Sequence, residues 1–168
     1  MGRRRETTDY LKECIADAMI KLLKNHTEDQ FTVQDITELA GVGRTTYFRH
    51  FASKKDVLIY KLTLMWNRWA GQHPYEQCKT DYERALWFFS FCDSLSSLLE
   101  LLFCRNLCDV LLDTFIRCIM PEHCEDQKTQ YTVMFMAYGM YGIALNWIRN
   151  GFLETPEELA AICVGRES

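Results

Sequence analysis

The sequence has no apolar run long enough to span a membrane. The longest apolar stretch, residues 95–112, is interrupted by Glu100, Arg105, Asn106 and Asp109, whereas a membrane-spanning helix needs roughly 18 or more predominantly apolar residues. The basic residues near the N-terminus are not followed by the apolar segment of a secretory signal peptide. We therefore expect a cytoplasmic protein with no membrane partner.

The sequence also lacks paired cysteines, although it contains eight of them. None forms a Cys-x-x-Cys pair. In a protein that is not exported, cysteines are expected to be reduced and mostly buried thiols. The alternative is a metal or redox site. Its candidate ligands are Cys104, Cys108, Cys118, His123 and Cys124, but a spacing of four residues on a helix lacks the tight turn of structural zinc sites. We expect no metal and no cofactor.

Motifs of the common enzyme classes are missing as well. The chain contains no Gly-x-Ser-x-Gly, no His-Glu-x-x-His and no glycine-rich phosphate loop, and its four histidines adjoin no nucleophile motif. A small enzyme with cysteine chemistry is an alternative that only the number of thiols favours. We expect that the protein is not an enzyme.

What the sequence does contain is apolar residues at helical spacing. No stretch shows the period-two alternation of a half-buried strand, and 48% hydrophobic residues in 168 positions are ample for a packed core. The spacing predicts an all-α fold. A first helix starts near Thr8 or Asp9, and the others are expected at about 33–40, 44–51, 54–69, 82–92, 95–104, 107–119 and 126–149 and after Thr155.

Positive charge is concentrated toward the N-terminus. Residues 1–65 carry 11 Lys and Arg against 9 Asp and Glu, a net charge of +2, while residues 66–168 carry 8 against 14, a net charge of −6. Only the first part can therefore attract a polyanion. We expect the chain to divide into two parts, residues 1–55, which carry the charge to bind a polyanion, and residues 56–168, which do not.

Two short predicted helices joined by residues 40–43 form a helix-turn-helix pattern. Gly41 is suited to the left-handed turn that ends the first helix. The second helix carries polar and basic side chains around an aromatic inner face, and such residues contact base edges and phosphates. On spacing alone, an ordinary helical hairpin is the alternative.

Residues 31–58 read FTVQDITELAGVGRTTYFRHFASKKDVL and resemble the signature of the TetR family of transcriptional regulators. The resemblance covers roughly the first 60 residues. It implies an N-terminal three-helix DNA-binding domain, a C-terminal helical bundle, and a homodimer that binds a palindromic operator in double-stranded DNA, in most cases as a repressor. It also implies that Thr46 contacts DNA and that His50 and Lys54 touch phosphates.

One position departs from the family pattern. The tyrosine that usually contacts a phosphate falls at Phe48, which has no hydroxyl, and Tyr47 is the candidate to replace it. An N-terminal basic arm is a further candidate, with a solvated terminus as the alternative. The complete set of expected DNA-contacting residues is Thr32, Arg44, Thr45, Thr46, Tyr47, Arg49, His50, Lys54, Arg3, Arg4 and Arg5.

The C-terminal part resembles regulators of dihydroxyacetone kinase operons. The resemblance lies in residues 139–151, GMYGIALNWIRNG, and in residues 155–159, TPEEL. It implies that the last two helices form the dimer, and since this subgroup holds both repressors and activators, the sign of regulation stays open. A central helix of a monomeric domain is the alternative. The expected interface residues are Tyr138, Gly139, Tyr141, Gly142, Leu145, Trp147 and Leu159.

Aromatic residues of the second part suggest a pocket for a small apolar effector. Plain core packing is the alternative for each of them. A scaffold or co-regulator that acts through a protein partner is the alternative function, favoured by the acidic C-terminal part and by Phe48. The expected pocket residues are Trp87, Phe91, Phe103, Phe115 and Phe135.

Overall fold

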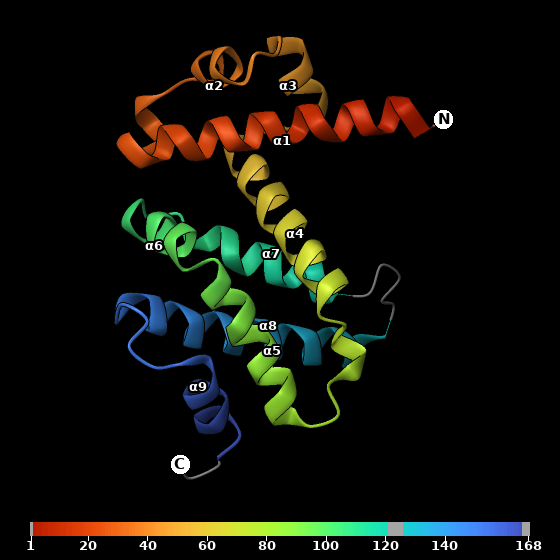
Figure 1. Ribbon diagram of the computed structural model, residues 1–168, viewed down its shortest axis with the longest axis vertical. Coiled ribbons are helices and arrows are strands. Elements are labelled where there is room, and N and C mark those ends of the chain that lie inside the picture. The colour runs from red at the N-terminus through yellow and green to blue at the C-terminus, as the bar shows by residue number, and fades with distance from the viewer. Residues whose placement is uncertain (1, 121–125, 166–168) are drawn as a thin grey trace. The chain divides into compact units, whose positions relative to one another are not determined.

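Every regular element in the described residues is a helix (Figure 1). The structure, a computed structural model, describes residues 2–120 and 126–165, with side chains described from residue 7 onward. The all-α prediction is confirmed. The α-helices are α1 (Gly2–Asn25), α2 (Val33–Ala40), α3 (Arg44–His50), α4 (Lys54–Gln72), α5 (Asp81–Ser94), α6 (Ser96–Cys104), α7 (Asp109–Ile119), α8 (Gln127–Arg149) and α9 (Pro156–Cys163), with 3-10 turns at Glu28–Gln30 and Tyr75–Gln77.

The chain forms two compact units, Met1–Leu62 and Thr63–Ser168. The boundary lies inside α4, later than the boundary expected after residue 55. The N-terminal half of α4 belongs to the first unit because Val57, Leu58 and Leu62 are buried there. Ser53 caps the start of α4, since its Oγ accepts from the Asp56 amide at 3.1 Å, and the residues that follow it complete the first core before the second unit begins.

The first unit has α1 packed against α2 and α3. Ile15, Met19 and Leu23 of α1 are fully buried, as is Ile36 of α2, since apolar residues three or four positions apart share one helix face. α1 begins at Gly2, earlier than the start expected near Thr8 or Asp9. Residues 3–5 therefore belong to the first turns of a helix.

The second unit is built around an aromatic core. α5 packs on α9, and α7 packs on α8. Trp66 meets Phe91 edge to face at a centroid distance of 5.1 Å, and Phe88 meets Phe115 in the same way at 5.1 Å. Among the described residues no single helix is long and apolar enough to cross a membrane. Within the same residues, only α5 and α6 taken together have that length and composition, and the two helices are bent by 70° relative to each other.

Candidate nucleic-acid interface

The turn between α2 and α3 is held by local hydrogen bonds. Thr32 caps α2, since its Oγ1 accepts from the Asp35 amide at 3.3 Å and the Asp35 carboxylate accepts from the Thr32 amide at 2.7 Å. α2 ends at Gly41, whose φ of 67° strains any residue with a Cβ atom. The amide of Val42 then donates to the Thr37 carbonyl at 3.0 Å. The expected left-handed turn at Gly41 is confirmed.

The outward face of α3 is polar and basic around one aromatic ring. Arg44, Thr45, Phe48 and Arg49 are exposed and together line a shallow hollow. Thr46 and His50 of the same helix are half-buried and are not part of its lining. A helix that presents two guanidinium groups and a hydroxyl has the donors and acceptors that phosphates and base edges require.

Tyr47 does not lie on this face, which corrects the sequence-based assignment. Its side chain is 1% exposed, packs against Phe51 at a ring distance of 5.8 Å, and leaves its hydroxyl without a hydrogen-bond partner. Burial, reinforced by the negative charges of Asp56 and Glu28, raises the pKa of Tyr47 to about 12. Neighbouring helix positions point about 100° apart. Tyr47 is therefore a core residue, and it does not substitute for a hydroxyl at Phe48.

Lys54 also has a different position from the one expected. Its ammonium group donates to the carbonyl oxygens of Glu28 and Phe31, the latter at 2.8 Å, and lies 4.7 Å from the centre of the Phe31 ring. These partners belong to the segment between α1 and α2. Lys54 thus ties the start of α4 to the segment that leads into the helix-turn-helix, a structural role that the sequence-based assignment did not include.

We expect Lys54→Met to lower the free energy of unfolding by about 1–3 kcal/mol, because two carbonyl groups lose a charged donor. Urea unfolding of the variant and the parent measures this loss. The slope of log K against log salt for DNA binding should stay unchanged, since a lysine bound to carbonyls releases no counterion from DNA. A slope reduced in magnitude by roughly one would show that Lys54 contacts a DNA phosphate.

The remaining residues expected to contact DNA precede α2 in the chain. Thr32 is exposed, and its hydroxyl donates to the Asp35 carboxylate at 2.8 Å as part of the helix cap. The backbone of Arg3, Arg4 and Arg5 belongs to α1, and their side chains lie outside the described residues. The arm expected at this end is therefore helical in its backbone.

α8 in the second unit has two apolar faces. The inner face carries the buried Ala137, Ala144 and Ile148. The opposite face is exposed, and a Cβ atom added at Gly139 or Gly142 would meet no atom within 4 Å. No other helix of the described chain covers the glycines. The large exposed residues of α8 are Tyr131, Phe135, Met136, Tyr138 and Ile143.

Two of the expected interface residues lie inside the chain itself. Trp147 is 1% exposed and Leu159 is 7% exposed. The Trp147 Nε1 donates to the Glu154 carbonyl at 3.0 Å, and its ring meets Phe152 edge to face at 4.7 Å. Trp147 thus joins the end of α8 to the segment that leads into α9, while Tyr141 and Leu145 are half-buried. The exposed Tyr131 was not among the expected residues, although its helical spacing to 135, 138 and 142 places it on the same side of α8.

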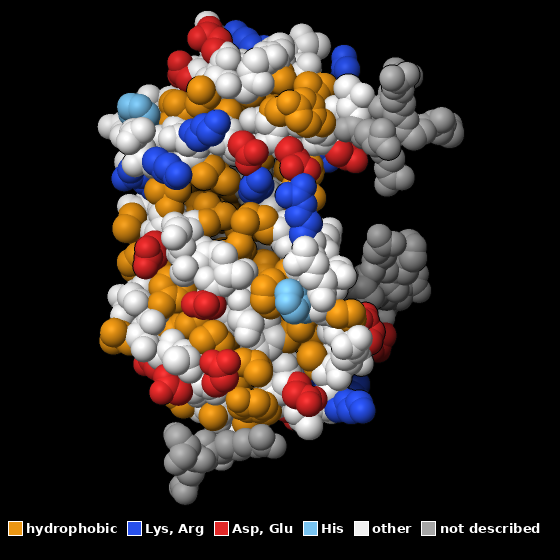
Figure 2. All heavy atoms as spheres, viewed as in Figure 1, with side chains coloured by type: hydrophobic (Ala, Val, Ile, Leu, Met, Phe, Trp, Pro, Cys, Tyr) orange, Lys and Arg blue, Asp and Glu red, His pale blue; other side chains and the backbone are white. Residues whose placement is uncertain are grey.

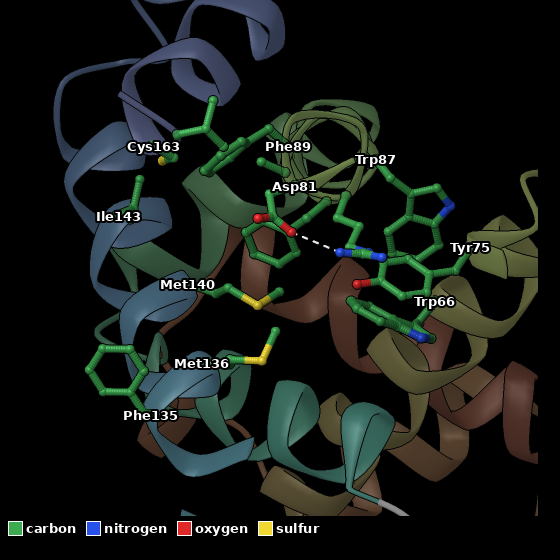
Figure 3. A pocket seen from close by; sticks show the side chains of 14 residues that line it. Trp66, Tyr75, Asp81, Trp87, Phe89, Phe135, Met136, Met140, Ile143 and Cys163 are labelled. Atoms are coloured by element: carbon green, nitrogen blue, oxygen red, sulfur yellow. Dashed lines mark hydrogen bonds and ion pairs between the residues drawn. The ribbon is translucent and has the colours of Figure 1, made fainter. Parts of the chain in front are cut away.

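A cleft of about 470 Å³ opens in the second unit between α4, α5, α8 and α9. Figure 3 shows Trp66, Tyr75 and Trp87 on one side, with Met136 and Met140 pointing in from α8. The Trp87 Nε1 donates to the His73 carbonyl at 2.6 Å, which fixes the indole. The charged groups drawn in the lining are Asp81 and Arg84, paired at 2.7 Å.

The structure divides the expected pocket residues into two sets. Trp87 and Phe135 line the cleft, and Phe135 is 82% exposed at its rim. Phe91 and Phe115 are buried behind the lining, and Phe103 is half-buried away from it. The expectation that Phe91, Phe103 and Phe115 line the pocket is therefore wrong. Trp66, Tyr75 and Met140 were not predicted, because a lining depends on helices far apart in the sequence.

The thiols do not gather into a reactive site in the part of the chain that the structure describes. Residues 123 and 124 of the hypothetical cluster lie outside it, and within it no three Cys, His, Asp or Glu side chains are arranged to hold a metal ion. Burial raises the pKa of the Cys108 and Cys118 thiols to about 11. Both remain protonated at neutral pH, whereas a nucleophilic cysteine must ionise.

A helix-turn-helix with a basic outward face, followed by a separate helical unit, defines a class of DNA-binding transcription regulators. The chain belongs to the TetR family. Residues 15–60 match the profile of bacterial regulatory proteins of the tetR family, and residues 90–164 match that of a transcriptional regulator C-terminal region. This membership confirms the resemblance stated above and the expectation of a regulator in place of an enzyme.

Individual relatives are similar over parts or all of the chain. A putative mycofactocin biosynthesis transcriptional regulator of Mycobacterium tuberculosis is 40% identical over 57 residues, which span 34% of this chain and only 27% of that protein. The fold is shared with a TetR transcriptional regulator from Streptococcus agalactiae, at 17% identity, TM-score 0.59 and 96% coverage of both chains. It is shared also with the dihydroxyacetone kinase operon activator DhaS, at 19% identity, TM-score 0.51 and 92% coverage of both.

Proposed function

We propose that this protein is a homodimeric transcriptional repressor that inserts α3 into the major groove of an inverted-repeat operator. The exposed face of Arg44, Thr45, Phe48 and Arg49 carries this proposal. A second helix of a helix-turn-helix enters the major groove with its N-terminal residues at the base edges. Occupying the operator excludes other proteins from the same DNA, and this steric mode of action is repression.

We expect Arg44→Ala and Thr45→Ala to weaken binding to the cognate operator by about 1–3 kcal/mol per half-site, and binding to random DNA much less. Both side chains stand at the exposed N-terminal end of α3, the end from which a recognition helix presents its residues to base edges. Titrations with a labelled operator and a scrambled duplex of the same length measure the two losses. Equal losses on both duplexes would mean that these residues only position the protein on DNA and do not read bases.

The exposed face of α8 supports the dimer. Two glycines with open space above their Cβ positions allow another helix to approach closely, and exposed aromatic residues beside them supply apolar area to bury. Apolar side chains reach the visible surface of the second unit among scattered Asp and Glu (Figure 2). A two-fold axis displays two copies of α3, so the half-sites of the operator should be about 34–36 Å apart or somewhat more.

The cleft of the second unit supports regulation by a small apolar effector. Its volume falls in the range of ligand pockets, and aromatic and methionine side chains dominate its lining. Methionines adapt to irregular ligand shapes because their side chains are unbranched and flexible. Trp66 and Trp87 stand in the lining, so the intrinsic fluorescence of the protein should report a bound effector.

A further inference from the structure

Phe48 is an apolar ring on a polar and basic surface. It is 56% exposed, and its neighbours in the same hollow are Arg44, Thr45 and Arg49. Phenylalanine has no hydrogen-bonding atom, so it cannot bind a phosphate oxygen. A large apolar side chain exposed at the centre of such a face indicates an apolar partner there.

Two neighbours hold the ring in place. The buried Tyr47 contacts it edge to face at a centroid distance of 5.3 Å and an interplanar angle of 80°. The Arg44 guanidinium lies over the ring, 5.9 Å from its centre. Arg44 and Phe48 are four residues apart, so they stand one above the other on the same side of α3. A guanidinium group and an apolar ring are thus presented together.

We propose that Phe48 is a base-reading residue whose ring packs against the C5-methyl group of a thymine, close to a guanine that Arg44 contacts. In the major groove the thymine methyl is the apolar group, and Arg pairs with the guanine O6 and N7 atoms. Four helical residues span about 6 Å, less than two base-pair steps of about 3.4 Å. The thymine therefore lies within two base pairs of the guanine.

This inference rests on the proposed entry of α3 into the major groove, and replacement of thymine by uracil tests it, because uracil lacks only the methyl group. The full chain first selects its site from a random duplex library, and each thymine of the selected site is then replaced in turn. At one position per half-site we expect uracil to weaken binding about fourfold, the effect of one lost buried methyl group.

The same titrations with Phe48→Ala assign the effect to the ring. We expect this variant to bind the thymine duplex more weakly than the parent does, and the thymine and uracil duplexes equally. Thr45→Ala is the matched control, since it removes a neighbouring methyl group from the same hollow, and it should keep the fourfold uracil effect. Phe48 is exposed, so the thermal midpoint of Phe48→Ala should equal that of the parent.

The outcomes separate this inference from the proposed function. Failure of the parent chain to select any site would overturn the proposed function and this inference with it. A selected site at which uracil has no effect, or an effect that persists in Phe48→Ala, would overturn the inference alone. An effect lost in Thr45→Ala and kept in Phe48→Ala would assign the thymine to Thr45.

Discussion

Gly142→Leu should convert the protein to a monomer and weaken operator binding by roughly 10²–10⁴-fold, although Gly142 lies in α8 and not in the helix-turn-helix. Linking two half-site contacts in one dimer accounts for a gain of that size. A leucine at the centre of the exposed α8 face holds a partner helix away, whereas the open space at this position leaves the folded chain undisturbed. Light scattering and operator titration measure the two effects.

Gly71→Leu is the matched control for this prediction. Gly71 also lies on a helix with open space at its Cβ position, but in α4 and not in α8. Leucine has the higher helix propensity, so neither variant should lose stability as a monomer. Full operator affinity in a demonstrably monomeric Gly142→Leu protein would contradict both the interface and the inverted repeat.

Trp147→Ala should lower the free energy of unfolding by about 3–5 kcal/mol, a large part of the stability of a typical domain. The indole is fully buried, and it supplies the hydrogen bond to the Glu154 carbonyl that closes the turn between α8 and α9. Trp147→Phe retains most of the apolar area and loses that hydrogen bond, so we expect it to cost less than Trp147→Ala. Urea unfolding measures both losses.

The dependence on protein concentration separates a core residue from an interface residue. Loss of a contact within one chain destabilises each subunit equally at every concentration, while loss of a contact between subunits has an effect that changes with concentration. We expect the difference between Trp147→Ala and the parent to be the same at low and high protein concentration. A difference in stability that varies with protein concentration would show that Trp147 lies in the dimer interface.

Most helix boundaries were predictable because the signals that set them are local. Thr32, Thr80 and Thr155 each exchange hydrogen bonds with an acidic residue three positions later, and the helices α2, α5 and α9 begin after them. Gly41 ends α2 because glycine adopts a positive φ without strain. The start of α1 was placed too late, since the basic residues before Thr8 show no apolar periodicity to extend it.

The candidate site was predictable only in part. Arg44, Thr45 and Arg49 could be placed on the outer face of α3 by spacing alone, and the structure exposes all three. Tyr47 and Phe48 are adjacent aromatic residues, and their sequence does not say which one points inward. The hydrogen bonds of Lys54 could not be predicted from local spacing, because its acceptors, in residues 28 and 31, precede it by more than 20 positions.

The sequence by itself determined the all-α class and the family, because periodicity, helix caps and the helix-turn-helix pattern act within a few residues. Only the tertiary structure decided that Tyr47 is buried, that Trp147 closes a turn inside the chain, and that Trp66 and Tyr75 line the cleft. Burial depends on which distant segments pack together. Such packing follows from the contacts of the whole unit and has no signature in any single stretch of residues.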